Sequence, residues 1–160
     1  MNTHTISVLV ENESGSLSRI AGLFSSRGYN ISSLSVAETD DPTISRMTIV
    51  AAGDEEILEQ IVKHLNRLIN VIKVMDFRTD PVVERELLLI RVSAKSSVRH
   101  EIKSLADVFG GKIVAISPSS TTVQLVADTK HVEEFISLVK PYGLKELVRS
   151  GKVALARAIK

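Results

Sequence analysis

The chain has 160 residues, no cysteine, twenty basic and nineteen acidic side chains, and a formal net charge of +1. The lack of cysteine excludes disulfides, thiol catalysis and thiolate metal sites, and the balanced charge gives no electrostatic reason to expect a nucleic acid or an anionic membrane as a partner. Hydrophobic residues make up 44% of the chain and aromatic residues only 4%, so we expect one or two small packed domains with an aliphatic core.

The first ten residues, MNTHTISVLV, lack the basic segment and the long apolar run of a signal peptide. No apolar stretch reaches the ~18 residues that a membrane-spanning helix needs. We therefore expect a cytoplasmic protein.

The first half of the chain reads as strand, helix, two strands, helix and strand. Strands are expected at residues 5–11, 30–38, 46–53 and 71–77, and helices at 16–27 and, with the stripe Ile57, Ile61, Leu65 and Leu68, after residue 54. Gly28 sits where a left-handed helix cap belongs, and Pro42 supplies the fixed backbone angle of a turn. Asp54 is expected to cap the second helix.

The same order of elements then starts again. Residues 79–85, TDPVVER, carry a proline and three charges and predict a linker. Strands are expected at residues 86–93, 111–117, 121–127 and 145–151, and helices at 97–109 and 129–141. Each half matches the ferredoxin-like split βαβ pattern, an antiparallel sheet with two helices on one face. The sequence therefore predicts an α+β protein of two βαββαβ domains in tandem, residues 1–78 and 86–160.

The second strand, residues 30–38, should lie at a sheet edge in this topology. It carries no lysine, no proline and no charge before Glu38, and these are the devices that usually protect an exposed edge. Pairing with the same strand of a second copy would satisfy the edge with two-fold symmetry. We therefore expect a dimer.

The turn before the first helix, ENESGS, is rich in groups that suit a small anion. A helix N-terminus presents free backbone amides and a partial positive charge, and Gly15 has no side chain to block them. Asn12 could meet either an ammonium or a carboxylate group, so an amino-acid-sized zwitterion would fit. Serine and asparagine at helix starts are also ordinary caps, and spacing alone leaves that alternative open.

Other kinds of site have weaker support in the sequence. The glycines lack the spacing of a nucleotide-binding fingerprint, the four histidines are scattered without a nucleophile and base arrangement, and the strands of the expected sheet lack aromatics for RNA. His131 and Glu134 lie one helical turn apart, which a solvated helix face explains better than a metal pair. Turn chemistry likewise explains Asp40 and Asp41 without a cation.

Several segments of the sequence closely resemble one protein family. The segments ENESGSLSRI, GLFSSRGYNI and DDPTISRMTI are similar to the N-terminal ACT domain of the regulatory small subunits of acetolactate synthase (acetohydroxyacid synthase). The segments DEEILEQIVKHLNRLINVIKV and VERELLLIRV continue the resemblance into the second domain, and it weakens over residues 95–160.

The resemblance implies a non-catalytic subunit that activates a separate, larger catalytic subunit and confers feedback inhibition by valine in branched-chain amino acid biosynthesis. It implies no catalytic residue, metal or cofactor in this chain, because thiamine diphosphate, Mg and FAD would belong to the catalytic subunit. It also implies an effector site between two ACT domains of a homodimer. By position, that site comprises Asn12, Gly15, Ser16 and Leu17 from one copy and Asn30 and Ile31 from the other.

Two other functions stay open from the sequence. The chain could be a free-standing amino-acid-binding ACT protein that acts on another enzyme. It could be an enzyme in its own right, although no residue stands out as acid, base or nucleophile. Nothing in the sequence assigns residues of the second domain to dimerisation or to contact with a catalytic subunit.

Overall fold

The computed structural model describes residues 2–158, which form two compact units. The first contains the chain up to Val83 together with the segment that begins at Lys152, and the second is Glu84–Gly151. No helix within the described part of the chain is long and apolar enough to cross a membrane.

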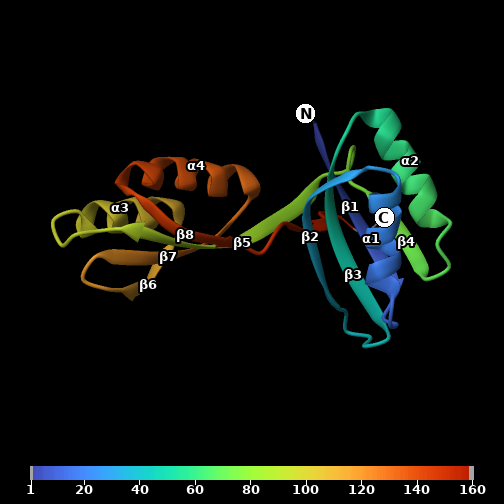
Figure 1. Cartoon of the computed structure of the whole chain (residues 1–160), viewed down its shortest axis with the longest axis horizontal. Coiled ribbons are helices and arrows are strands. Elements are labelled where there is room, and N and C mark those ends of the chain that lie inside the picture. The colour runs from blue at the N-terminus through green and yellow to red at the C-terminus, as the bar shows by residue number, and fades with distance from the viewer. Residues whose placement is uncertain (1, 159–160) are drawn as a thin grey trace. The chain divides into compact units, whose positions relative to one another are not determined.

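The first unit is an antiparallel sheet with two helices on one face (Figure 1). Its elements are β1 (Thr3–Glu11), α1 (Ser16–Ser26), β2 (Asn30–Glu38), β3 (Ile44–Ala52), α2 (Glu55–Asn66) and β4 (Val71–Asp76). The strand order is β2-β3-β1-β4, so β2 lies at the edge of the sheet. The sequence prediction of a βαββαβ unit with the second strand at the edge is confirmed.

The core of this unit lies between the sheet and its two helices. Alternate residues of β1 point inward, as period-two burial requires, and the helices contribute residues one turn apart. The buried members include Ile6, Val8 and Val10 of β1, Ile20 and Phe24 of α1, and Leu58, Ile61 and Leu65 of α2. Of the stripe expected for α2, Ile61 and Leu65 are buried, while Ile57 and Leu68 pack against the core partly buried.

The C-terminal end of α1 shows why the chain turns into β2 at this point. Gly28 has a φ of +70°, the left-handed conformation expected from the sequence. Its amide donates to the Ser25 carbonyl, and the Tyr29 amide donates to the Phe24 carbonyl at 3.0 Å. The rings of Phe24 and Tyr29 meet edge to face at 6.0 Å. These are the two bonds and the apolar contact of a Schellman motif, which ends the helix and aims the next strand.

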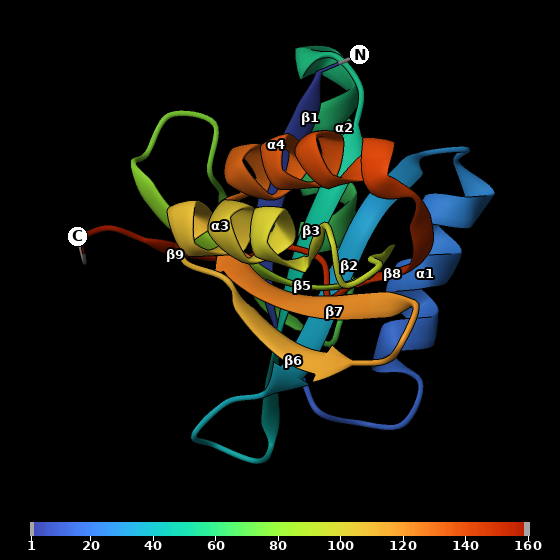
Figure 2. The same ribbon diagram turned by 90° about the vertical axis from the view of Figure 1, so that its left-hand side faces the viewer.

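The second unit repeats the architecture with its own core. Its elements are β5 (Val82–Ser93, which starts in the first unit), α3 (Arg99–Phe109), β6 (Lys112–Ile116), β7 (Ser120–Ala127), α4 (Thr129–Val139), the short 3-10 helix η1 (Lys140–Tyr142) and β8 (Leu144–Arg149). The strand order is β6-β7-β5-β8, and Figure 2 shows α3 and α4 side by side over one face of this sheet. Glu86 is only 4% exposed and is paired with Arg149 at 2.6 Å, so its buried charge is compensated.

Two segments differ from the sequence prediction. One lies at the boundary between the two expected domains, and the other lies after β8. Strand β5 begins at Val82, inside the segment 79–85 that was expected as a linker. Residues Val153–Ala156 form a further strand, β9, which pairs with β5 and which the sequence reading did not include. The Lys152 amide donates to Ser33 Oγ at 3.1 Å, so this segment packs with the first unit.

Candidate functional site

The turn between β1 and α1 leaves backbone amides free at the start of the helix. Gly15 is the N-cap residue with a φ of +90°, and no side chain caps the helix within the described structure. The amides of Leu17 and Ser18 donate to no acceptor among residues 2–158. The first turn of α1 carries no acidic side chain that would offset the helix dipole. An anionic group such as a carboxylate is therefore favoured here.

Ser16 belongs to the framework of this turn. It is 5% exposed, and its hydroxyl donates to the Glu11 carbonyl at 2.8 Å. Its amide donates to the Glu13 carbonyl at 3.2 Å. The side chain is thus committed within the chain, and Ser16 holds the shape of the turn.

Asn12 ties the turn to the hairpin between β2 and β3. Its amide nitrogen Nδ2 donates to Glu38 Oε1 at 3.1 Å and to the Pro42 carbonyl at 2.9 Å. Both partners are acceptors, which fixes the orientation of the side-chain amide. The group left for a ligand is the acceptor Oδ1, which suits an ammonium rather than a carboxylate.

The hairpin that receives Asn12 is itself held by Asp41. The Asp41 carboxylate accepts hydrogen bonds from the amide and the hydroxyl of Thr43, at 2.9 and 2.7 Å. These bonds stabilise the ionised form, and they hold the pKa of the Asp41 carboxyl below its ordinary value of 3.8. Hydrogen bonding within the turn therefore accounts for Asp41 without a cation.

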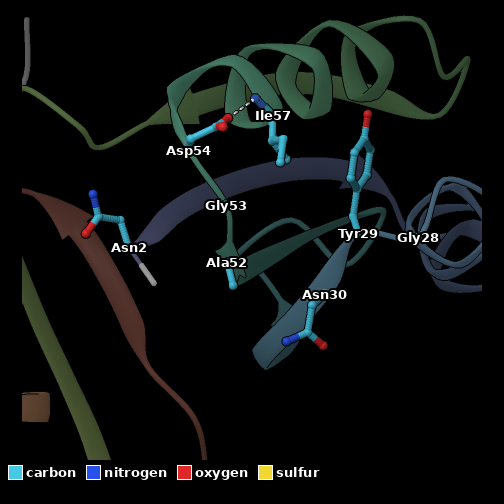
Figure 3. Close-up of a pocket in the computed structure, with 8 residues that line it drawn as sticks. All are labelled: Asn2, Gly28, Tyr29, Asn30, Ala52, Gly53, Asp54 and Ile57. Carbon is cyan, nitrogen blue, oxygen red and sulfur yellow. Dashed lines mark hydrogen bonds between the residues drawn. The ribbon is translucent and has the colours of Figure 1, made fainter.

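Asn30 lies at the other end of β2, where it lines a pocket of about 470 Å³ (Figure 3), and Ile31 follows it in the strand. The pocket is lined by Asn2, Gly28, Tyr29, Asn30, Ala52, Gly53, Asp54 and Ile57. Asp54 caps α2, as expected, by accepting the Ile57 amide at 2.9 Å. The pocket thus offers the exposed amide of Asn30 next to an apolar wall.

The structure brings the expected site residues together in two separate groups. Asn12, Gly15, Ser16 and Leu17 share the turn beside Glu38, the last residue of β2, whereas Asn30 and Ile31 begin that strand. Eight residue steps at ~3.3 Å place the two groups roughly 26 Å apart along the strand. One amino acid cannot touch both groups within one chain.

Apolar side chains remain exposed around the turn and along β2. Leu17 is 44% exposed, Leu34 36% and Val36 44%. The register pairs Leu34 with Ile49 and Val36 with Met47, so both lie on the helix side of the sheet without being covered. Their exposure leaves an apolar strip along the edge strand of the sheet.

Asn70 is a residue of this region that the sequence reading missed. It is 4% exposed and lies just before β4, under the turn. Its Nδ2 donates to Glu13 Oε2 and to Ser16 Oγ, each at 3.2 Å, and its Oδ1 accepts from Arg19 at 2.5 Å. The only sequence signal is one polar residue inside the apolar run LINVI, and that signal does not reveal its partners.

The described residues contain no group of three or more potential metal ligands. His131 is hydrogen-bonded through Nδ1 to Asp128, the N-cap residue of α4, at 2.8 Å. This contact gives His131 a local role in the helix start. A metal pair with Glu134 therefore gains no support.

Two family models together match most of the chain. The model described as the AHAS small subunit-like ACT domain matches residues 6–73. The model described as the small subunit of acetolactate synthase matches residues 85–158. The two matches fall on the two halves of the repeated βαββαβ pattern.

Whole-chain relatives agree with these matches. The chain is 52% identical over 156 residues to the acetolactate synthase small subunit of Haemophilus influenzae, covering 97% of this chain and 96% of that protein. It is 47% identical over 156 residues, with the same coverage, to the acetolactate synthase isozyme 3 small subunit of Escherichia coli. The crystal structure of the acetolactate synthase small subunit from Thermotoga maritima matches with a TM-score of 0.88 and 35% identity over all of both chains. The chain belongs to the family of acetolactate synthase small subunits.

Proposed function

We propose that this small subunit binds a branched-chain amino acid, with valine as the first choice, in a site shared by two copies of the chain. Through that site it controls a separate catalytic subunit of acetolactate synthase. The catalytic chemistry, with thiamine diphosphate, Mg and FAD, belongs to that larger partner. A cytoplasmic location stays a prediction.

The observation that carries this proposal is the division of the site between the two ends of β2. In an antiparallel pair of β2 strands related by a two-fold axis at Leu34, residue 30 of the second copy lies opposite residue 38 of the first. Asn12 is hydrogen-bonded to Glu38. This pairing would therefore bring Asn30 of one copy next to the turn before α1 of the other copy. The two groups of site residues, which lie far apart within one chain, would then form a single site.

The chemistry of the completed site suits a zwitterion with an apolar side chain. The free amides of Leu17 and Ser18 would donate to the carboxylate, and Asn12 Oδ1 would accept from the ammonium. The exposed side chain of Leu17 supplies an apolar wall. One methylene in such a pocket changes affinity by only ~1–3 kcal/mol, so valine, leucine and isoleucine should differ by modest factors.

The presence of the second unit supports assembly with a catalytic subunit rather than the function of a free-standing ACT protein. The family model for acetolactate synthase small subunits matches residues 85–158, outside the ACT domain. A free-standing amino-acid sensor would need only the first unit. The whole-length relatives named as small subunits support the same preference.

The test is acetolactate production by the complex reconstituted with its catalytic subunit, across a valine titration. Gly15→Asp and Gly15→Asn are compared, because Asp and Asn have the same shape and both tolerate the left-handed region better than other residues. A Cβ at Gly15 meets no atom within 4 Å, so both side chains have room. Any difference between the variants therefore reports the added negative charge.

We expect Gly15→Asp to need at least tenfold more valine for half inhibition than Gly15→Asn. Loss of one charge-assisted hydrogen bond costs ~1.5–3 kcal/mol, and ~1.4 kcal/mol corresponds to one decade. Equal valine sensitivity in the two folded variants would show that the turn is only a helix start. Absence of any valine response in the native complex would remove the effector assignment.

A further inference from the structure

The β1–α1 turn, residues 12–17, is organised by side chains that lie beneath it. Asn70 is the centre of this set, since its amide group contacts Glu13, Ser16 and Arg19. Its backbone carbonyl also accepts the Glu11 amide at 2.9 Å. A single buried residue just before β4 thus holds both sides of the turn.

The start of α1 differs from those of two other helices in how it is ordered. Asp54 and Asp128 each cap their own helix by accepting an amide of its first turn, at 2.9 Å in both cases. Such a cap occupies an amide that an anionic ligand would otherwise use. At α1 the N-cap is Gly15, which has no side chain to cap the helix, so the turn is ordered by other contacts, including those of Ser16 and Asn70.

We propose that Asn70 is the positioning residue of the effector site. It fixes the turn from below, in place of a helix cap, and thereby leaves the first-turn amides of α1 both ordered and free. The identity of the ligand in this proposal rests on the proposed function. The ordering of the turn by Asn70 does not depend on which ligand binds.

The chemistry of the site requires an asparagine. The side chain must donate to Glu13 and Ser16 and at the same time accept from Arg19. An aspartate keeps the acceptor for Arg19 but cannot donate, and it places a second carboxylate beside Glu13. An aliphatic side chain of similar size would leave the buried hydroxyl of Ser16 without this partner.

Order in the turn bears directly on affinity. A ligand that binds a disordered turn must also supply the free energy that orders it, whereas a preformed turn avoids that cost. Asn70 should therefore act on effector affinity through the turn, without touching the ligand.

The test uses Asn70→Asp, with Asn66→Asp as the matched control at an exposed position at the end of α2. A third protein combines Asn70→Asp with Glu13→Gln, so that the new amide at position 13 donates to the new carboxylate at position 70. In this double variant the hydrogen bond that Arg19 donates becomes an ion pair with the carboxylate at position 70, and the Ser16 hydroxyl can rotate to donate to the same carboxylate. The double variant restores the hydrogen bond between positions 13 and 70 with donor and acceptor exchanged. A protein that had lost stability in general would not recover through this exchange.

Two readouts are taken on the full chain. The first is amide hydrogen exchange at Ser16 and Arg19 without effector, because these amides are bonded to Glu13 and Gly15 within the turn. The second is the Kd for valine by titration calorimetry. We expect Asn70→Asp to exchange at both amides at least roughly tenfold faster and to bind valine at least roughly tenfold more weakly, while Asn66→Asp matches the native chain.

The double variant should return both quantities to within about threefold of the native values. Unchanged exchange in Asn70→Asp, faster exchange with unchanged affinity, or no recovery in the double variant would each overturn the positioning role. If the native chain binds no branched-chain amino acid, the proposed function fails, and the exchange data still decide whether Asn70 orders the turn.

Discussion

Asn12 Nδ2 donates to Glu38 Oε1 at 3.1 Å, and this contact joins the turn before α1 to the last residue of the edge strand β2. The two residues are 26 positions apart in the chain. The strand edge that a second copy would use and the turn that a ligand would use are therefore parts of one hydrogen-bonded region. Assembly and effector binding should influence each other, as linkage requires when both depend on the same groups.

The first prediction tests that contact directly. Glu38→Ala should weaken valine binding by roughly three- to tenfold, because a net hydrogen bond is worth ~0.5–1.5 kcal/mol and Asn12 loses one that fixes its orientation. Glu38→Gln retains a carbonyl acceptor in the same place and should stay within about twofold of the native chain. Calorimetric titration of the three proteins measures both effects. Equal weakening by Ala and Gln would mean that the charge, and not the orientation of Asn12, is what matters.

The second prediction concerns the edge of the first sheet. The alternation of the strand predicts that a charge at Leu34 or Val36 would disrupt the core and that lysine at Ser33 or Ser35 would be the cleaner substitution. The register does place Ser33 and Ser35 opposite Val50 and Thr48, on the face away from the helices, as expected. Ser33, however, accepts the Lys152 amide, and Val36 is 44% exposed, so the order of preference is reversed.

Val36→Lys should therefore leave the single chain folded and convert the dimer to monomer at micromolar concentration. A lysine on an edge strand opposes pairing with another edge, and with the two-fold axis at Leu34 position 36 lies opposite residue 32 of the other copy, within the paired segment. Val108→Lys, at a residue of α3 that is 80% exposed, is the matched control and should remain dimeric. Light scattering after size-exclusion chromatography reports the mass. A monomeric native chain under these conditions would contradict the interface.

The third prediction compares two glycines that lie six residues apart. Gly28→Ala should lower the free energy of unfolding by ~1–2 kcal/mol, because its φ of +70° suits few residues with a Cβ. Gly22 lies inside α1 with open space where a Cβ would be, and Gly22→Ala should raise the stability by up to ~1 kcal/mol. Urea denaturation followed by circular dichroism gives both values. A Gly28→Ala protein at least as stable as the native chain would show that the helix end does not depend on the left-handed residue.

Much of this architecture follows from local patterns in the sequence. The strand and helix periodicities, the cap at Asp54 and the left-handed position of Gly28 each depend on residues a few positions apart. The edge position of β2 follows from the topology that those elements imply. These predictions are confirmed because the determining residues are neighbours in sequence.

The features that were missed depend on distant partners. Asn70 reaches residues 13, 16 and 19, more than fifty positions away. Strand β9 is only four residues long, and it pairs with a strand that lies some seventy positions earlier in the chain. The sequence also could not distinguish a ligand-binding turn from an ordinary capped helix start at Gly15. No side chain caps this helix in the described part of the chain, and this favours the ligand-binding turn.

The most direct measurement of the shared site mixes two chains that are each deficient in binding. Gly15→Asp damages the turn, and Asn30→Ala removes the group that the other copy would contribute. In a mixed dimer, one site carries both substitutions. The other site combines an unsubstituted turn with an unsubstituted Asn30. After random reassociation about half of the dimers are mixed, so about one quarter of the native number of tight valine sites should return.

Equilibrium dialysis with labelled valine counts these sites, and native mass spectrometry of a mass-tagged partner verifies that mixed dimers form. We expect neither variant alone to show tight sites and the mixture to recover about one quarter of the native number. If mixed dimers form and no tight site returns, the effector is not bound between the turn of one copy and Asn30 of the other, and the central claim is wrong.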